Sequence, residues 1–214
     1  MKIKWFNVSS FLITTDKGTR IITDPYFHNY MPEDPAPPPG WDSNRPGIAE
    51  AADVIALSHG HFDHSYIWAV KGVPRLYTGG ETIEIKGVRF SSVVTWHDNY
   101  GQGGRGLNNI IGIETDGIRI MHMGDYGQKM LYDEQLAKIG RVDILLTPWG
   151  DWALPLLSRL KPKVVIPMHH TTADQMKNVK GFTQIDVSEV EFKSNALPSE
   201  MKVIMLKASL ESSM

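Results

Sequence analysis

Six consecutive residues, His59-Gly60-His61-Phe62-Asp63-His64, place three imidazoles and one carboxylate directly after an apolar run. The preceding residues, 53–58, have the pattern of a strand buried on both faces, so a rigid element would aim these side chains. Residues two apart in an extended chain project to the same side, so His59 and His61 can grip one metal ion. The aspartate and the last histidine follow where the chain must turn, and can reach a second metal beside the first.

The composition limits which other chemistry is open to this chain. None of the 214 residues is a cysteine, so disulfides, cysteine-zinc sites and thiol nucleophiles are excluded. Any metal must therefore be held by histidine and carboxylate, which bind borderline-soft divalent ions without thiolates. With 42% apolar and 21% charged residues, the chain suits one globular domain over residues 1–214 with a substantial core.

Charge and hydropathy indicate which partners to expect. A net charge of −2 without basic runs gives no electrostatic basis for binding nucleic acid or an anionic membrane surface. The first residues lack the long apolar core of a signal peptide, and no apolar run approaches the length of a membrane span. We therefore expect a cytoplasmic protein whose partner is a small-molecule substrate, with no nucleic-acid or membrane partner.

Hydrophobic patterning predicts a β-rich chain with helices between the later strands. Strands are expected over 2–7, 10–15, 19–23, 54–57, 73–77, 81–85, 88–95, 109–114, 118–123, 142–147, 164–167 and 202–206. Helices are expected over 65–70, 132–139, 152–160 and from Thr171 or Thr172 to Val179. The strands between residues 73 and 95 have an antiparallel pattern. Sheets packed face to face with helices outside, an α/β sandwich, accommodate this order.

Residues 31–47 form a segment with six prolines and two glycines. Long loops in compact domains are often functional, so this segment can lie over the mouth of a pocket, although an inert surface loop fits the composition equally well. In the first case, Trp41 and the nearby His28 would contact substrate.

Further candidate ligands recur where the expected strands end. His97, Asp125 and His169 each follow such a strand, which suits a site built on one edge of the sheets. Six of the eight histidines lie in or next to these groups, namely His59, His61, His64, His97, His169 and His170. His170 would point away from its neighbour in an extended chain, so His169 is the expected ligand.

Other polar residues near these positions are candidates for supporting roles. Asp98 is expected to accept a hydrogen bond that sets the tautomer of its neighbour His97, and His122 to support the ligands rather than to bind metal. The glycine-rich loop 101–106 can bring backbone N–H groups close to an anion, with Arg105 adding a bidentate donor. A flexible turn is an equally good interpretation of this loop. Asn108 would fix Arg105 or touch substrate.

On these motifs the chain resembles the metal-dependent hydrolases of the metallo-β-lactamase superfamily. It is most similar to a branch of largely uncharacterised hydrolases related to ascorbate-6-phosphate lactonase. The resemblance to the superfamily rests on the motif His-x-His-x-Asp-His. The resemblance to the branch rests on two stretches, His97-Asp98 with Gly103-Gly104-Arg105-Gly106 and Asn108, and His122-Met123-Gly124-Asp125.

The resemblance implies a four-layer αβ/βα sandwich, with two mixed sheets, outer helices and the site at the sheet edges. It also implies a ligand set, with one metal on His59, His61 and His97, a second on Asp63, His64 and His169, and Asp125 bridging both. One departure is Val8, in Asn7-Val8-Ser9-Ser10, where relatives commonly have a histidine.

Two divalent metal ions, zinc or else manganese or iron, would share a water molecule and lower its pKa. The predicted function is hydrolysis by metal-bound hydroxide of a small, anionic ester, lactone or phosphodiester, with Asp63 both a ligand and a catalytic residue that orients the hydroxide. A nuclease acting on RNA or DNA is an alternative, which the absence of a basic surface disfavours. A non-catalytic metal-binding or sensor protein is another, but structural zinc normally needs only four closed ligands.

Overall fold

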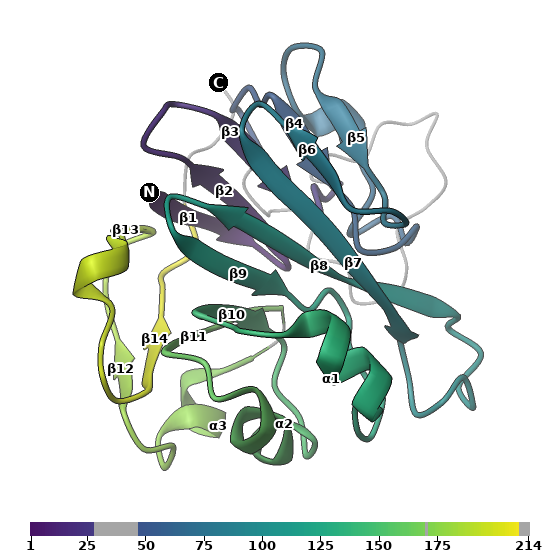
Figure 1. Cartoon of the computed structure of the whole chain (residues 1–214), viewed down its shortest axis with the longest axis vertical. Helices are drawn as coiled ribbons and strands as arrows, with labels where there is room; N and C mark the ends of the chain where they lie inside the picture. Colours follow the sequence, from purple (N-terminus) through teal and green to yellow (C-terminus); the bar gives the residue numbers. More distant parts are fainter. Residues whose placement is uncertain (28–46, 170, 210–214) are drawn as a thin grey trace.

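Two mixed β-sheets form the framework of the computed structural model, which describes residues 1–27, 47–169 and 171–209 (Figure 1). The first sheet has the order β13-β1-β2-β3-β4-β5. Its strands are β1 (Lys2–Asn7), β2 (Ser10–Thr14), β3 (Arg20–Thr23), β4 (Val54–Ala56), β5 (Arg75–Tyr77) and β13 (Glu189–Glu191).

The second sheet has the order β12-β14-β11-β10-β9-β8-β7-β6. Its strands are β6 (Ile83–Ile85), β7 (Val88–Trp96), β8 (Leu107–Thr115), β9 (Ile118–His122), β10 (Ile144–Thr147), β11 (Val164–Pro167), β12 (Phe182–Gln184) and β14 (Lys202–Met205). The helices α1 (Asp133–Ile139), α2 (Ala153–Leu160) and α3 (Ala173–Met176) lie beside this sheet (Figure 1). Two 3-10 turns, η1 (Ile67–Ala69) and η2 (Ser194–Ala196), complete the described elements.

Alternation along the strands of the first sheet divides the core into two layers. On β3 and β4, Ile21, Val54 and Ala56 face the second sheet, while Ile22 and Ile55 face the other way, toward the layer that includes η1. All five side chains are at most 1% exposed, because a strand in mid-sheet is covered on both faces. Burial on this scale stabilises the sheet pair by roughly 25 cal/mol per Å² of apolar surface.

The strand directions bring the expected ligands to one edge of the sheets. β9, β10 and β11 run parallel, and β7 is antiparallel to β8, which is antiparallel to β9. β7, β9 and β11 therefore end on the same side of the second sheet. In the first sheet, β4 is parallel to β3 and β5 and runs directly into His59.

Most of the expected elements are present, and the αβ/βα sandwich is confirmed. The antiparallel pattern expected between residues 73 and 95 is wrong at its first strand, because β5 pairs in parallel with β4 and only β6 and β7 form a hairpin in the other sheet. The helix expected over 65–70 is the 3-10 turn η1, and α3 starts after Thr172 but ends at Met176. The short strand β13, which adds to the first sheet from the C-terminal part, had no clear pattern.

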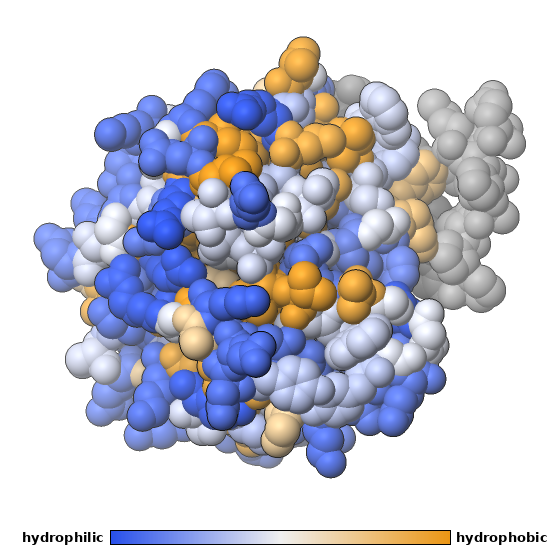
Figure 2. All heavy atoms as spheres, turned by 45° about the vertical axis from the view of Figure 1, so that its right-hand side comes forward, coloured by the Kyte–Doolittle hydropathy of each residue, from blue (hydrophilic) through white to orange (hydrophobic). Residues whose placement is uncertain are grey.

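The described surface is mostly hydrophilic. Figure 2 shows separate apolar patches among polar side chains on the face that carries β5, β6 and β7. The exposed apolar side chains of the chain include Trp68, Val73 and Leu76. Among the described residues, no helix has the length and apolar character needed to cross a membrane.

Candidate metal centre

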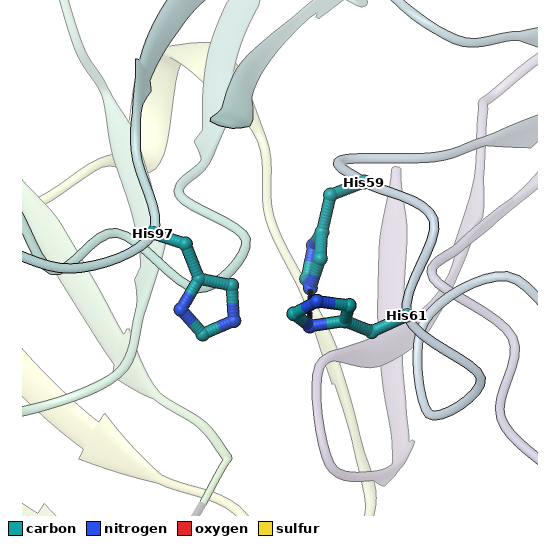
Figure 3. Close-up of side chains that lie close together, drawn as sticks. All are labelled: His59, His61 and His97. Atoms are coloured by element: carbon teal, nitrogen blue, oxygen red, sulfur yellow. Dashed lines mark hydrogen bonds between the residues drawn. The ribbon is translucent and has the colours of Figure 1, made fainter. Parts of the chain in front are cut away.

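The first group of ligand candidates is His59, His61 and His97, whose imidazoles turn toward a common space from opposite sides (Figure 3). His59 and His61 come from the segment after β4, and His97 from the end of β7. One nitrogen of each ring lies within 4.8 Å of those of the other two, and His59 Nε2 is 3.0 Å from His61 Nδ1. Three nitrogens converging in this way can bind one metal ion.

The second group contains Asp63, His64, Asp125 and His169, whose ligand atoms also lie within 4.8 Å of one another. Asp63 Oδ2 is 3.6 Å from His64 Nε2 and 4.0 Å from His169 Nε2. A turn between His61 and His64, closed by the His64 N–H donating to the His61 carbonyl at 2.9 Å, separates the two groups. This turn is why adjacent residues of one hexapeptide can serve two different metals.

Asp125 lies between the two groups. Its Oδ2 is 3.1 Å from His97 Nε2, while its Oδ1 is 3.1 Å from His64 Nε2 and 3.3 Å from His169 Nε2. One oxygen therefore faces each group, which is the arrangement that a bridging carboxylate needs. The expected role of Asp125 agrees with this position.

Several of the ligand atoms are close together but have no hydrogen-bond partner among the described residues. Within the described part of the chain, His64 Nε2, both ring nitrogens of His97 and Asp125 Oδ1 are buried and have no hydrogen-bond partner. Buried polar atoms left in this state cost free energy, and native proteins pair nearly all of them. Imidazole and carboxylate groups that converge without hydrogen-bonding geometry fit divalent metal ions as the missing partner.

Burial and neighbouring charges shift the pKa values of these groups in different directions. Burial, together with the charge of His64, lowers the pKa of His59 to about 3, so its ring is neutral at neutral pH, which is the metal-binding form. Burial opposes a charge on His64, but the carboxylates of Asp125 and Asp24 outweigh it and raise the pKa of His64 to about 10. Burial would raise the pKa of Asp125, but His169, His64 and His97 hold it far below its usual range.

Asp24, at the end of β3, is a site residue that the sequence analysis did not identify. Its carboxylate is fully buried and accepts hydrogen bonds from the Ser58 N–H at 2.7 Å and the Ser58 hydroxyl at 2.6 Å. Its Oδ2 is also 2.8 Å from His64 Nδ1. Asp24 thereby orients His64 so that Nε2 faces the second group. The available signal was its position, since it is a carboxylate at a strand end like the other ligand candidates.

Val8 has no side-chain role at the site, but its backbone does. Its φ of +46° is a left-handed conformation that a β-branched residue rarely adopts. In this conformation its carbonyl accepts the His169 N–H at 2.8 Å and the Trp5 Nε1–H at 3.0 Å. His169 also has a positive φ, +62°. The β1–β2 turn thus helps to place His169 through a backbone carbonyl rather than through a side chain.

Asn108 is not a substrate contact and does not hold Arg105, contrary to both expectations. It is fully buried, and its Nδ2 donates to the Met123 carbonyl at 2.9 Å and to Thr95 Oγ1 at 3.1 Å. Its Oδ1 accepts the Asp125 N–H at 3.0 Å. Asn108 therefore fixes the backbone from which the bridging carboxylate projects.

Gly124 is required at the same place. Its φ is +56°, and a Cβ there would lie 2.2 Å from Asn108 Oδ1 and 2.5 Å from Ser58 Cβ. Only glycine allows the chain to pass so close to Asn108 and Ser58 before Asp125.

The expected role of Asp98 is also wrong. Its Oδ2 accepts the backbone N–H of Arg105 at 3.1 Å, and within the described residues no hydrogen bond joins it to His97. Asp98 therefore closes the 101–106 loop rather than setting a tautomer. The Arg105 side chain is exposed on this loop, and its predicted contact with substrate stays a prediction.

His122 lies next to Asp24 and contacts the backbone near the ligand candidates, and its supporting role stays a prediction. It is fully buried, with Nε2 2.7 Å from the Ser9 carbonyl and 3.9 Å from Asp24 Oδ2. Its Nδ1 accepts the Gly124 N–H at 3.2 Å. Several predictions concern positions outside the described residues. They are the substrate contacts of His28 and Trp41, the role of the 31–47 loop, of which only Gly47 is described, and the exclusion of His170 as a ligand.

Comparison with known proteins places this arrangement in a family. The model of the beta-lactamase superfamily domain matches residues 2–169, so the chain belongs to the metallo-β-lactamase superfamily. Among curated relatives, a UPF0173 metal-dependent hydrolase from a Polaromonas species is 28% identical over 219 residues, covering 79% of this chain and 77% of that protein. Another from Thermoplasma volcanium is 30% identical over 158 residues, covering 58% and 69%, respectively.

A solved structure supports the same assignment. A protein of the metallo-beta-lactamase superfamily from Thermotoga maritima superposes with a TM-score of 0.73 and 27% identity. The match covers 97% of this chain and 99% of that one. The protein is a metal-dependent hydrolase, and the enzyme class expected from the sequence is confirmed.

Proposed function

We propose that this protein uses two divalent metal ions to hydrolyse a small, anionic ester, lactone or phosphodiester. The observation that carries the proposal is the position of Asp125 between the two groups of ligand candidates. His59, His61 and His97 would hold one ion, and Asp63, His64 and His169 the other. Zinc suits this set of imidazoles and carboxylates, with manganese and iron as alternatives.

The chemistry divides between the metals and the side chains. When bound, two divalent ions act as Lewis acids and lower the pKa of a shared water molecule toward neutrality. Asp63, whose side chain is 19% exposed, reaches the open side of the site and would orient the attacking water through a hydrogen bond. Asp24 and Asn108 would hold His64 and Asp125 in the orientations that their ligand roles require.

The substrate class follows from access and charge. His61 is exposed, so one side of the site is open to solvent and a small molecule can approach it. The exposed side chain of Arg105 lies on the loop after His97 and would favour an anionic substrate. The net charge of −2 disfavours a long polyanion such as RNA, which needs a basic surface.

Metal analysis of the purified protein tests the first half of the proposal. We expect about two ions per chain, with His97→Ala and His64→Ala each lowering the content by about one. A content below one ion per chain that neither variant changes would contradict the dinuclear site. A variant that loses one ion but keeps full hydrolysis would indicate that this ion has a structural or sensing role rather than a catalytic one.

A substrate screen tests the second half. Lactones, phosphodiesters and thioesters are offered to the metal-reconstituted protein, and each responsive substrate is tested with Asp63→Asn. We expect a loss of activity of at least 100-fold, since general acid–base and positioning residues contribute about 10² to 10⁴. Asp186→Asn, an exposed aspartate paired with Lys207, is the matched control and should keep full activity. Tight, length-dependent RNA binding with a steep salt dependence would instead support a nuclease.

A further inference from the structure

A cavity lies beside the candidate metal centre, between the segment after β9 and the start of α2. Its volume is about 610 Å³. The lining side chains include Lys129, Met130, Asp151, Trp152, Pro155 and Arg159. A smaller recess of about 20 Å³ shares most of these residues and adds Tyr126. Such a recess has room for about one water molecule or one substrate oxygen atom.

Backbone contacts tie this cavity to the metal ligands. Two of its lining residues, Asn99 and Gly127, are each two positions along the chain from a ligand candidate, His97 and Asp125. The Gly127 N–H donates to the Trp96 carbonyl at 3.3 Å. A Cβ at Gly127 would lie 2.2 Å from the His97 carbonyl oxygen, so the cavity wall and the His97 backbone are in direct contact. A substrate whose reacting group is at the metals can place another group here.

Tyr126 is the residue that singles out this cavity. Its side chain is 2% exposed, and within the described residues its hydroxyl has no hydrogen-bond partner. A buried hydroxyl without a partner lowers stability, so its retention calls for a partner that is not part of the chain. Burial, with the nearby Tyr100, raises the pKa of Tyr126, so the hydroxyl stays a neutral hydrogen-bond donor.

The other lining residues indicate what that partner is. The Trp152 ring packs edge-to-face against Tyr126 with centroids 5.0 Å apart, and Met130 and Pro155 extend this apolar wall. Arg159 is fixed by the Leu131 carbonyl at 2.7 Å and by Asp133 at 2.6 Å. Lys129 lines both the cavity and the recess and, among the described residues, makes no ion pair. The lining is thus largely apolar, with one hydroxyl donor in the recess, the available ammonium group of Lys129, and one carboxylate, that of Asp151.

We propose that this cavity binds the non-reacting part of the substrate, an aryl or similarly apolar group that carries an anionic oxygen group. The apolar group lies against Trp152 and Met130, and one anionic oxygen enters the recess to accept the Tyr126 hydroxyl, with Lys129 nearby. This inference deepens the proposed function and depends on it for the position of the reacting group. It names Tyr126 and Lys129 as residues that select the substrate.

Binding of naphthoate to the metal-containing protein, measured by calorimetry, tests this subsite without requiring turnover. Tyr126→Phe should weaken binding about tenfold, since a hydrogen bond to a charged acceptor is lost. Lys129→Gln should weaken it about threefold and flatten its salt dependence. Naphthylmethanol, which has the same ring system without the charge, should respond little to Lys129→Gln.

Two matched variants serve as controls. Tyr132→Phe and Lys138→Gln change the same residue types in a different groove, beside β7 and α1, and should leave naphthoate binding unchanged. The thermal midpoint of Tyr126→Phe should equal or exceed that of the unaltered protein, because the variant removes an unpaired buried hydroxyl. A lower midpoint would mean that the hydroxyl has a structural partner, and would overturn the inference.

The outcomes separate this inference from the proposed function. If Tyr126→Phe binds naphthoate as tightly as the unaltered protein, the recess holds only water and the subsite is wrong, even if hydrolysis is found. If binding changes as expected but no ester, lactone or phosphodiester is hydrolysed, the subsite stands and the substrate class fails. With a responsive aryl substrate, Tyr126→Phe should raise KM about tenfold and leave kcat nearly unchanged.

Discussion

Replacing Asp24 by asparagine should weaken metal binding by the second group of ligand candidates without removing any member of that group. The carboxylate Oδ1 accepts the Ser58 N–H, while Oδ2 accepts the Ser58 hydroxyl and faces His64 Nδ1 at 2.8 Å. In Asp24→Asn the amide oxygen keeps the bond to the Ser58 N–H, so the amide NH₂ group takes the place of Oδ2. The NH₂ group then donates a hydrogen bond to His64 Nδ1, so the ring proton must lie on Nε2. A protonated Nε2 cannot bind a metal ion.

The size of the effect follows from these contacts. Groups that orient a metal-binding histidine typically contribute 10- to 100-fold in metal affinity. At about 1.4 kcal/mol per factor of ten, the loss in the free energy of metal binding is about 1.4 to 2.8 kcal/mol. The free energy of unfolding should fall by a similar amount, about 1 to 3 kcal/mol, because one charge-assisted hydrogen bond is lost from a fully buried group.

A competition titration against a chromogenic chelator measures the affinity of each metal separately. We expect the site that contains His64 to weaken 10- to 100-fold in Asp24→Asn, and the site of His59, His61 and His97 to change much less. Asp53→Asn is the matched control, since Asp53 also accepts a backbone N–H, that of Arg20 at 2.9 Å, but contacts none of the ligand candidates. If Asp24→Asn binds both ions like the unaltered protein, the tautomer argument is refuted.

Three other predictions concern the backbone around Asp125 and the metals themselves. Gly124→Ala should lower the free energy of unfolding, measured by urea titration, by about 3 kcal/mol or more, because its Cβ would lie 2.2 Å from a buried side-chain oxygen. Gly104→Ala is the control, because nothing lies within 4 Å of a Cβ there, and it should cost about 1 to 2 kcal/mol. Asn108→Asp should cost about 3 kcal/mol and lower the metal content, because an unpaired charge is placed in a fully buried site; the exposed Asn195→Asp should do neither. Removing the metals with a chelator should lower the thermal midpoint by several degrees, since ligands that bind only the folded state stabilise it. An unchanged midpoint would show that the ligand atoms do not need a metal.

The sequence contains enough information to bring the ligand candidates together. The hexapeptide follows a buried strand, and His97, Asp125 and His169 each come at a strand end, so the strand directions alone place them on one edge. Hydrophobic patterning also predicts most strand bounds to within one or two residues, because β1, β3 and β11 carry buried apolar residues, in β11 as one continuous run.

What could not be predicted depends on side-chain direction and on pairing between distant segments. Asp24, followed by proline, has the pattern of a turn, and only the packing of β3 against β4 brings it to Ser58. Asp98 and Asn108 were assigned to the wrong partners, because their neighbours along the chain are not their neighbours in space. The parallel position of β5 depends on the crossover through η1, which periodicity does not encode.

The contact between Val8 and His169 has a consequence for how the protein matures. The His169 N–H reaches the Val8 carbonyl, so the second group of ligands is completed only when the first hairpin meets the end of β11. The hexapeptide leaves the ribosome long before His169 does, and contacts of such large sequence separation form late because loop closure is costly. A nascent chain can therefore offer at most part of its ligand set. Full metal loading indicates that the first hairpin has packed against the end of β11.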